Sequence, residues 1–236
     1  MLTRPITEMS GLSRVIEKQM RNWELGRAQR PDVFIPHRQD VAQFVTIANI
    51  CGAGGNEVSQ MLSERLGWPV FDREILTLMA RDDGVRESLY RSMDERDLNW
   101  FESIFRTLVQ QEFRKNDYFH RLTQVILWLA RQGPAVYVGR SADLILPKDK
   151  GLRVKVIASM ERCVENFTRF NNVSPDQARR EIDRIERERR EFVENHFHVD
   201  PNASTRFDLL IRVDRFSTSQ VVDLISCAMK ARGIVH

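Results

Sequence analysis

The stretch FVTIANICGAGGN, residues 44–56, decides the fold of this chain. Its first half is an apolar run with the length and composition of a buried strand, and its second half is a glycine-rich turn. Directly after the turn, apolar residues between 58 and 66 recur at helical spacing, and Gly67 closes the helix. A strand, a glycine turn and a helix in immediate succession predict the first unit of a parallel α/β sheet.

Further extended segments follow at residues 68–71, 135–138, 152–158 and 208–213. Helical patterns lie between them, which favours parallel strands joined by helical crossovers. We therefore predict a doubly wound α/β fold, with a mainly parallel sheet and helices on both of its faces.

The chain divides into two predicted parts. Residues 1–40 are expected to form an N-terminal helical arm and linker, and residues 41–236 the α/β domain. Within the domain we expect a helical insert at about 75–132 and a lid-like charged helix at about 174–200. The arm carries an amphipathic helix at 10–28. Its apolar stripe fits either its own domain or a second copy of the chain, so a homodimer remains open.

The bulk composition excludes several classes of function. A net charge of +3 over 236 residues gives no case for binding nucleic acid or an anionic membrane. No apolar run is long enough to cross a bilayer, and the N-terminus lacks an apolar signal segment. The three cysteines form no CxxC pair, which favours scattered thiols over a zinc site or a disulfide framework. We predict a cytoplasmic protein.

The glycine turn has the chemistry of a phosphate site. Its backbone N–H groups can converge, and the following helix adds partial positive charge at its N-terminus. The P-loop pattern GxxxxGK[ST] fits only in part, because Asn49 replaces its first glycine, Gly55 its lysine and Asn56 its hydroxyl residue. The residues predicted to bind the phosphates of a nucleotide are Gly52, Ala53, Gly54, Gly55, Asn56 and Glu57.

Several segments, in order, resemble the cytidylate-kinase-like family of P-loop proteins. They are TIANICGAGGNEVS at 46–59, FDRE at 71–74, VGRSADLIL at 138–146, ERERR at 186–190 and FDLLIR at 207–212. The resemblance covers about residues 43–230. It implies a P-loop kinase-like fold and an ATP-dependent transfer of a phosphoryl group to a nucleoside monophosphate or another small acceptor, with Mg²⁺ bridging the donor phosphates.

The resemblance also implies which side chains act. Arg140 would grip the acceptor phosphate, and arginines on the charged helix would close over the transferring group. The residues implied for catalysis are Arg140, Arg187, Arg189 and Arg190, and those implied for the acceptor are Asp72, Arg73, Arg140 and Asp143. No residue is assigned as a metal ligand.

Plainer interpretations stay open for the same residues. Arg140 could pair with a neighbouring carboxylate, and the charged helix could be a solvated helix with ion pairs between successive turns. At the level of function, the missing loop lysine favours a catalytically inactive nucleotide-binding or scaffold protein, whereas the arginines favour a phosphotransferase. We take the phosphotransferase as the working hypothesis.

Overall fold

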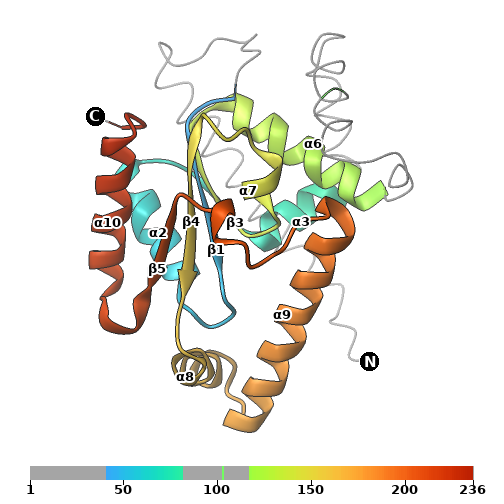
Figure 1. Cartoon of the computed structure of the whole chain (residues 1–236), viewed down its shortest axis with the longest axis vertical. Helices are drawn as coiled ribbons and strands as arrows, with labels where there is room; N and C mark the ends of the chain where they lie inside the picture. The colour runs from blue at the N-terminus through green and yellow to red at the C-terminus, as the bar shows by residue number, and fades with distance from the viewer. Residues whose placement is uncertain (1–40, 82–102, 104–116, 236) are drawn as a thin grey trace, which may run out of the picture. The chain divides into compact units, whose positions relative to one another are not determined.

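The computed structural model describes residues 41–81, 103 and 117–235 (Figure 1). The predicted N-terminal arm and much of the predicted helical insert lie outside these residues. The strands are β1 (Phe44–Asn49), β2 (Val70–Phe71), β3 (Ala135–Val138), β4 (Gly151–Ile157) and β5 (Leu209–Arg212). The helices are α2 (Gly55–Leu66), α3 (Arg73–Arg81), α6 (Asp117–Gln132), α7 (Ala142–Ile145), α8 (Met160–Asn171), α9 (Pro175–Phe197) and α10 (Thr218–Ala231), with 3-10 turns η3 (Ser204–Arg206) and η4 (Val213–Arg215).

The strands form one parallel sheet in the order β2-β3-β1-β4-β5. Strand β1 lies at its centre, with β3 on one side and β4 on the other, and the first four residues of β1 are buried. Strands covered on both faces read as continuous apolar runs, which is why the sequence revealed them. The prediction of a mainly parallel sheet is confirmed.

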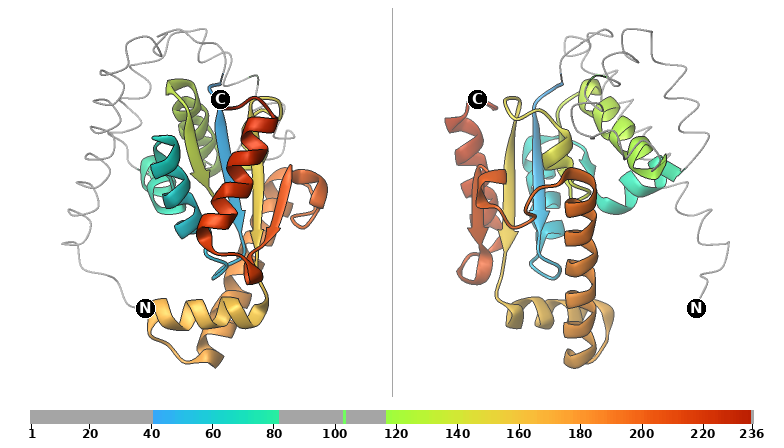
Figure 2. Two further views of the ribbon diagram at one scale, coloured as in Figure 1. Left: turned by 90° about the vertical axis from the view of Figure 1, so that its left-hand side faces the viewer. Right: turned by 45° about the vertical axis from the view of Figure 1, so that its right-hand side comes forward.

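Helices cover both faces of the sheet, as predicted. Helices α2 and α10 pack together on one face, and α3, α6, α7 and α9 lie on the other (Figures 1 and 2). The core under α2 and α10 includes Val45, Ile47, Val154, Val222 and Ile225, all of which are almost fully buried. The described part of the chain is therefore doubly wound.

The connections change face at β1. Strand β1 leads into α2 on one face, whereas its neighbours β3 and β4 lead into helices on the other. In open α/β sheets such a reversal, at the carboxyl ends of the strands, is where ligands bind. Helix α8 lies across this carboxyl edge (Figure 2). The topology therefore places the glycine turn, residues 50–54, at the edge expected to carry the site.

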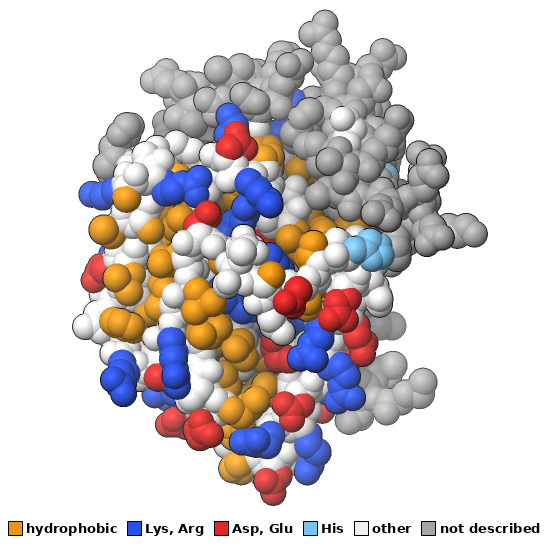
Figure 3. Space-filling model, in the orientation of Figure 1, with side chains coloured by type: hydrophobic (Ala, Val, Ile, Leu, Met, Phe, Trp, Pro, Cys, Tyr) orange, Lys and Arg blue, Asp and Glu red, His pale blue; other side chains and the backbone are white. Residues whose placement is uncertain are grey.

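The long charged helix begins and ends close to its predicted limits. Ser174 caps α9 in a reciprocal capping box with Gln177, and Pro175 occupies the first turn, where its missing N–H costs nothing. Helix α8 was not predicted; Ser159 caps it by accepting a hydrogen bond from the N–H of Arg162. Charges of both signs gather over α9 on the face seen in Figure 3.

Candidate phosphate-binding site

The glycine turn is shaped to receive an anion. Gly52 and Gly54 have φ angles of +83° and +82°, values that favour glycine, and Ala53 separates them. Alternation of this kind turns successive N–H groups toward one point. Gly54 is also the N-cap of α2, and no side chain accepts a capping hydrogen bond there. Within the described ranges, no hydrogen bond is donated by the backbone N–H groups of Gly52, Gly54, Gly55, Asn56 and Glu57.

Helix α8 holds one side of the turn. A Cβ at Gly52 would lie 2.4 Å from the carbonyl oxygen of Cys163, so only glycine fits there. The side-chain amide of Asn166 donates to the carbonyl of Gly52 at 2.8 Å. Burial raises the pKa of Cys163 to about 11, so its thiol stays protonated at neutral pH and acts as a packing group.

Helix α9 holds the other side of the turn. Glu186 accepts a hydrogen bond from the N–H of Cys51 at 2.9 Å. Arg189 donates from Nη1 to the carbonyl of Asn49 at 2.8 Å and to the carboxylate of Glu186 at 2.6 Å. The sequence implied Arg189 as a lid residue but did not identify Glu186, although its spacing of three residues from Arg189 puts both on one side of the helix.

The two departures from the P-loop pattern touch each other. A Cβ built on Gly55, at the lysine position, would lie 2.5 Å from Cγ and 2.7 Å from Cβ and Oδ1 of Asn49. The three atoms nearest to a Cβ at Gly55 therefore all belong to the side chain at the first-glycine position. A side chain at position 55 would clash with Asn49 unless the Asn49 side chain shifts or is itself exchanged.

Arg140 sits in a strained turn at the end of β3. Gly139, Arg140 and Ser141 have φ angles of +71°, +51° and +54°. Non-glycine residues seldom adopt such angles, and they persist mainly where the surrounding structure enforces them, often at functional sites. Nε of Arg140 donates to the hydroxyl of Thr77 on α3 at 3.0 Å. Among the described residues its partner is thus a hydroxyl, not a carboxylate.

The surroundings of Arg140 are positively charged. Burial lowers the pKa of Arg140, and the guanidinium groups of Arg73, Arg81 and Arg189 act in the same direction. The ring of Tyr118 lies within cation–π distance of both Arg140 (6.0 Å) and Arg81 (5.7 Å). The hydroxyl of Tyr118 is buried and has no hydrogen-bond partner among the residues that the structure describes. Clustered guanidinium groups beside an unsatisfied hydroxyl are suited to an anionic ligand.

Two of the residues implied for the acceptor have structural partners. Asp72 caps α3 by accepting hydrogen bonds from the N–H groups of Glu74 (2.9 Å) and Ile75 (2.8 Å). Asp143 forms a buried ion pair with Arg206 at 2.7 Å, which links α7 to η3. Arg73, the first residue of α3, is exposed.

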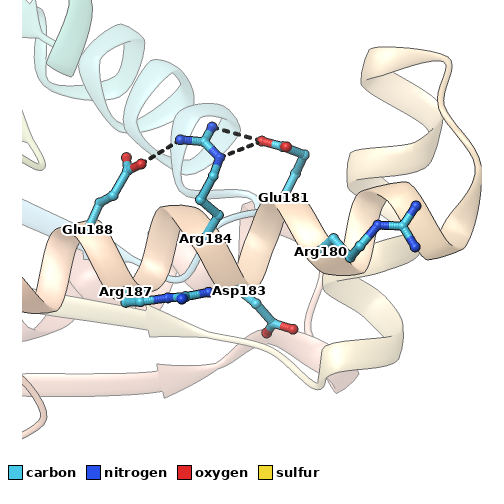
Figure 4. Close-up of a pocket in the computed structure, with 6 residues that line it drawn as sticks. All are labelled: Arg180, Glu181, Asp183, Arg184, Arg187 and Glu188. Atoms are coloured by element: carbon cyan, nitrogen blue, oxygen red, sulfur yellow. Dashed lines mark hydrogen bonds and ion pairs between the residues drawn. The ribbon is translucent and has the colours of Figure 1, made fainter.

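The arginines implied for catalysis on α9 separate into two groups. Arg189 reaches the turn, whereas Arg187 and Arg190 are exposed. Arg187 lines a shallow surface pocket along α9, shown in Figure 4. In this pocket Arg184 pairs with Glu181 and Glu188, one turn away on either side. That part of α9 matches the solvated helix with ion pairs that the sequence left open.

The described residues contain neither a metal cage nor a membrane helix. No group of three or more His, Cys, Asp or Glu side chains among them could hold a metal ion. The helices of the same part of the chain are also too short or too polar to span a bilayer.

The fold and the turn together define an α/β protein of the P-loop class. The sequence model of the Cytidylate kinase-like family matches residues 44–215, which is most of the chain, and the chain belongs to this family. No significant match was found among curated proteins.

One solved structure shares the fold, and two others align more loosely. An uncharacterized protein from Eubacterium ventriosum aligns with a TM-score of 0.63 at 18% identity, over 80% of this chain and 98% of that chain. A shikimate kinase from Bacteroides thetaiotaomicron gives 0.44 at 10% identity, over 81% and 99%. A gluconokinase from Sinorhizobium meliloti gives 0.40 at 12% identity, over 83% and 96%. The first alignment shows a shared fold. The two looser alignments say nothing about the substrate of this chain.

Proposed function

We propose that the protein is an ATP-dependent phosphotransferase that moves a phosphoryl group to a nucleoside monophosphate or another small anionic acceptor. One observation carries the proposal. Arg140 lies in the turn after β3, the strand next to β1, and has no carboxylate partner among the described residues. The glycine turn after β1 has N–H groups that donate to no described residue. A donor phosphate and an acceptor anion could therefore sit at one edge of the sheet.

Each group has a task that suits its chemistry. The N–H groups at 54–57 would hold donor phosphates at the start of α2, where the helix dipole favours negative charge. Arg140 would bind the acceptor's anionic group, since guanidinium groups grip phosphate through parallel hydrogen bonds. Phosphoryl transfer needs mainly positioning and neutralisation of charge, and N–H and guanidinium groups are the types of group that supply both.

The chain fits the phosphates of a nucleotide better than it fits a free metal ion. The unpaired N–H groups of the turn suit phosphate oxygens. Mg²⁺ usually keeps several waters and is held by one or two carboxylates together with substrate phosphates. The described residues offer no cage for it, so it would be held chiefly through the donor phosphates. When bound there, it would neutralise the charge that develops on the phosphates.

A nucleotide-binding protein without catalysis is the second candidate. The glycine at position 55 favours it, because the lysine that normally reaches the terminal phosphates is absent. Both candidates predict that ATP binds, and only the first predicts transfer to an acceptor.

Calorimetric titration tests the shared part of these proposals. The purified protein is titrated with ATP and Mg²⁺, and then with a panel of nucleoside monophosphates. Arg140→Ala should weaken acceptor binding about 10- to 100-fold, the loss expected for a hydrogen bond to a charged group, and leave ATP binding almost unchanged. Arg184→Ala, which removes an exposed arginine on α9, is the matched control. A folded protein that binds no nucleotide would refute both candidates.

A further inference from the structure

The loop lacks a cation at the position where the P-loop pattern has one. In that pattern the lysine reaches the terminal phosphates of the donor. Gly55 stands at its place, and the side chain of Asn56 beside it is neutral. A site that neutralises a triphosphate needs positive charge close to the loop. The cation must then come from another element.

We propose that Arg189 of α9 replaces the loop lysine, with Glu186 as its positioning residue. The inference rests on the proposed function, because it concerns the same donor phosphates. Arg189 lies at the right place: Nη1 is 2.8 Å from the carbonyl of Asn49, the first residue of the loop pattern. A side chain at Gly55 would also start against Asn49. Arg189 of α9 therefore contacts Asn49, the same residue that the Cβ of a lysine at position 55 would contact.

The remaining donors of Arg189 are available to a ligand. Its Nη1 serves both Asn49 and Glu186, whereas Nε and Nη2 donate no hydrogen bond within the described ranges. The side chain is 37% exposed, so it is anchored at the loop and still open to solvent. A planar guanidinium with two free donors can grip phosphate oxygens bidentately.

Glu186 fixes the direction of this arginine. Its carboxylate oxygen Oε1 accepts from both Arg189 Nη1 (2.6 Å) and the N–H of Cys51 (2.9 Å). One acidic side chain thereby ties the guanidinium to the backbone of the loop. A cation that is held in place before the ligand arrives loses less side-chain entropy on binding.

Lys155 of β4 is a competing cation, and its ammonium lies over an aromatic ring. Lys155 on β4 pairs in register with Ala48 of β1 and is half-buried. Its Nζ lies over the ring of Phe207, 5.4 Å from the centroid, and Phe207 precedes the first residue of β5. Strand β5 starts opposite Val154, so the ammonium leans away from the carboxyl edge. Arg189 is the better replacement.

A charge-swap experiment tests the replacement. Binding of ATP with Mg²⁺ is measured by calorimetry for the wild type and for Arg189→Gln, which removes the charge but keeps a donor for the Asn49 carbonyl. We expect affinity to fall about 10- to 100-fold. Adding Asn49→Gly and Gly55→Lys to Arg189→Gln restores a lysine on the loop without the clash at Asn49. This triple variant should recover affinity to within about threefold of the wild type, a factor worth less than 1 kcal/mol.

The controls separate the inference from the proposed function. Arg180→Ala removes an exposed arginine of α9 and should bind like the wild type. Wild-type affinity in Arg189→Gln, or a folded triple variant that stays weak, would overturn the replacement and leave the proposed function intact. A wild-type protein that binds no ATP would overturn both. Circular dichroism confirms folding, and Arg189→Lys, which keeps the charge, should lose less affinity than Arg189→Gln.

Discussion

Asn49 and Gly55 both depart from the P-loop pattern, and one steric contact between the two positions links these departures. Judged singly, each is a loss from the P-loop pattern. In space the side chain at 49 lies where a Cβ at 55 would be. Gly55→Lys alone should therefore be strained, and Asn49→Gly should relieve that strain. The coupling is steric, and the linear pattern does not display it.

The backbone strain at Arg140 should lower the free energy of unfolding by a measurable amount. Its φ of +51° suits glycine better than any L side chain. Arg140→Gly and Arg140→Ala both remove the guanidinium and its bond to Thr77, but only the glycine relieves the backbone. Chemical denaturation should find the glycine variant more stable than the alanine variant by about 1 kcal/mol, and both should bind the acceptor weakly. Equal stability would mean that the turn is not strained.

At the scale of elements, α8 and α9 grip the glycine turn from two sides. Asn166 and the backbone of Cys163 hold Gly52, while Glu186 and Arg189 hold Cys51 and Asn49. These contacts fix the turn before any ligand binds. Substitution of a contacting residue such as Asn166 or Glu186 should therefore alter binding through the shape of the loop.

Asp214, which binds the start of α8, should make the stability of the fold depend on pH. Hydrogen bonding from Ser159, the N-cap of α8, and from Arg212 holds the pKa of Asp214 well below its usual range. A depressed carboxyl pKa stabilises the folded state above about pH 4, and this contribution is lost as pH falls through the lowered pKa. Asp214→Asn should therefore be less stable than the wild type at pH 7, and the difference should shrink below about pH 4. Urea denaturation at several pH values measures it, and a difference independent of pH would contradict the assignment.

The elements were more predictable than the site. Buried strands and capped helices leave local signatures, such as the apolar run 44–50 and the Ser174–Gln177 capping box. Helix α8 was missed. The contacts that build the site join residues far apart in the chain: Cys51 and Glu186 are 135 positions apart, and Thr77 and Arg140 are 63 apart. No local periodicity encodes such pairs. The glycine turn was predicted from its own sequence, whereas Arg140 and Arg189 were predicted only through the family resemblance.

At the scale of the whole molecule, the sheet order brings the site together. Strands β3 and β4 flank β1, so the turns after β1 and β3 and the start of α8 meet at one edge. Binding at this edge should stabilise the entire domain. At about 100 times its Kd, ATP should add about 2.7 kcal/mol, which corresponds to a rise in Tm of about 5–10 °C for a chain of this size. Differential scanning calorimetry with and without ATP checks this; an unchanged Tm at saturating ATP would contradict binding to the native state.

The amphipathic helix predicted at 10–28 lies outside the described residues. Measuring the molar mass of the protein tests whether this helix pairs with a second copy of the chain. A homodimer through this helix would have about twice the chain mass of 27.6 kDa. Ile16→Glu, a charge placed on the apolar stripe, should then halve the mass measured by light scattering. A monomeric wild type would contradict a homodimer through this helix.

Phosphoryl transfer without a loop lysine can be measured directly. The wild-type protein is incubated with Mg²⁺, ATP labelled in its γ-phosphoryl group and a panel of nucleoside monophosphates, and the products are separated. We expect label in a single nucleoside diphosphate, and we expect Arg140→Ala and Arg189→Gln to reduce it strongly. If ATP binds but no label leaves it for any acceptor, the protein is a nucleotide-binding protein without catalysis, and the phosphotransferase account is wrong.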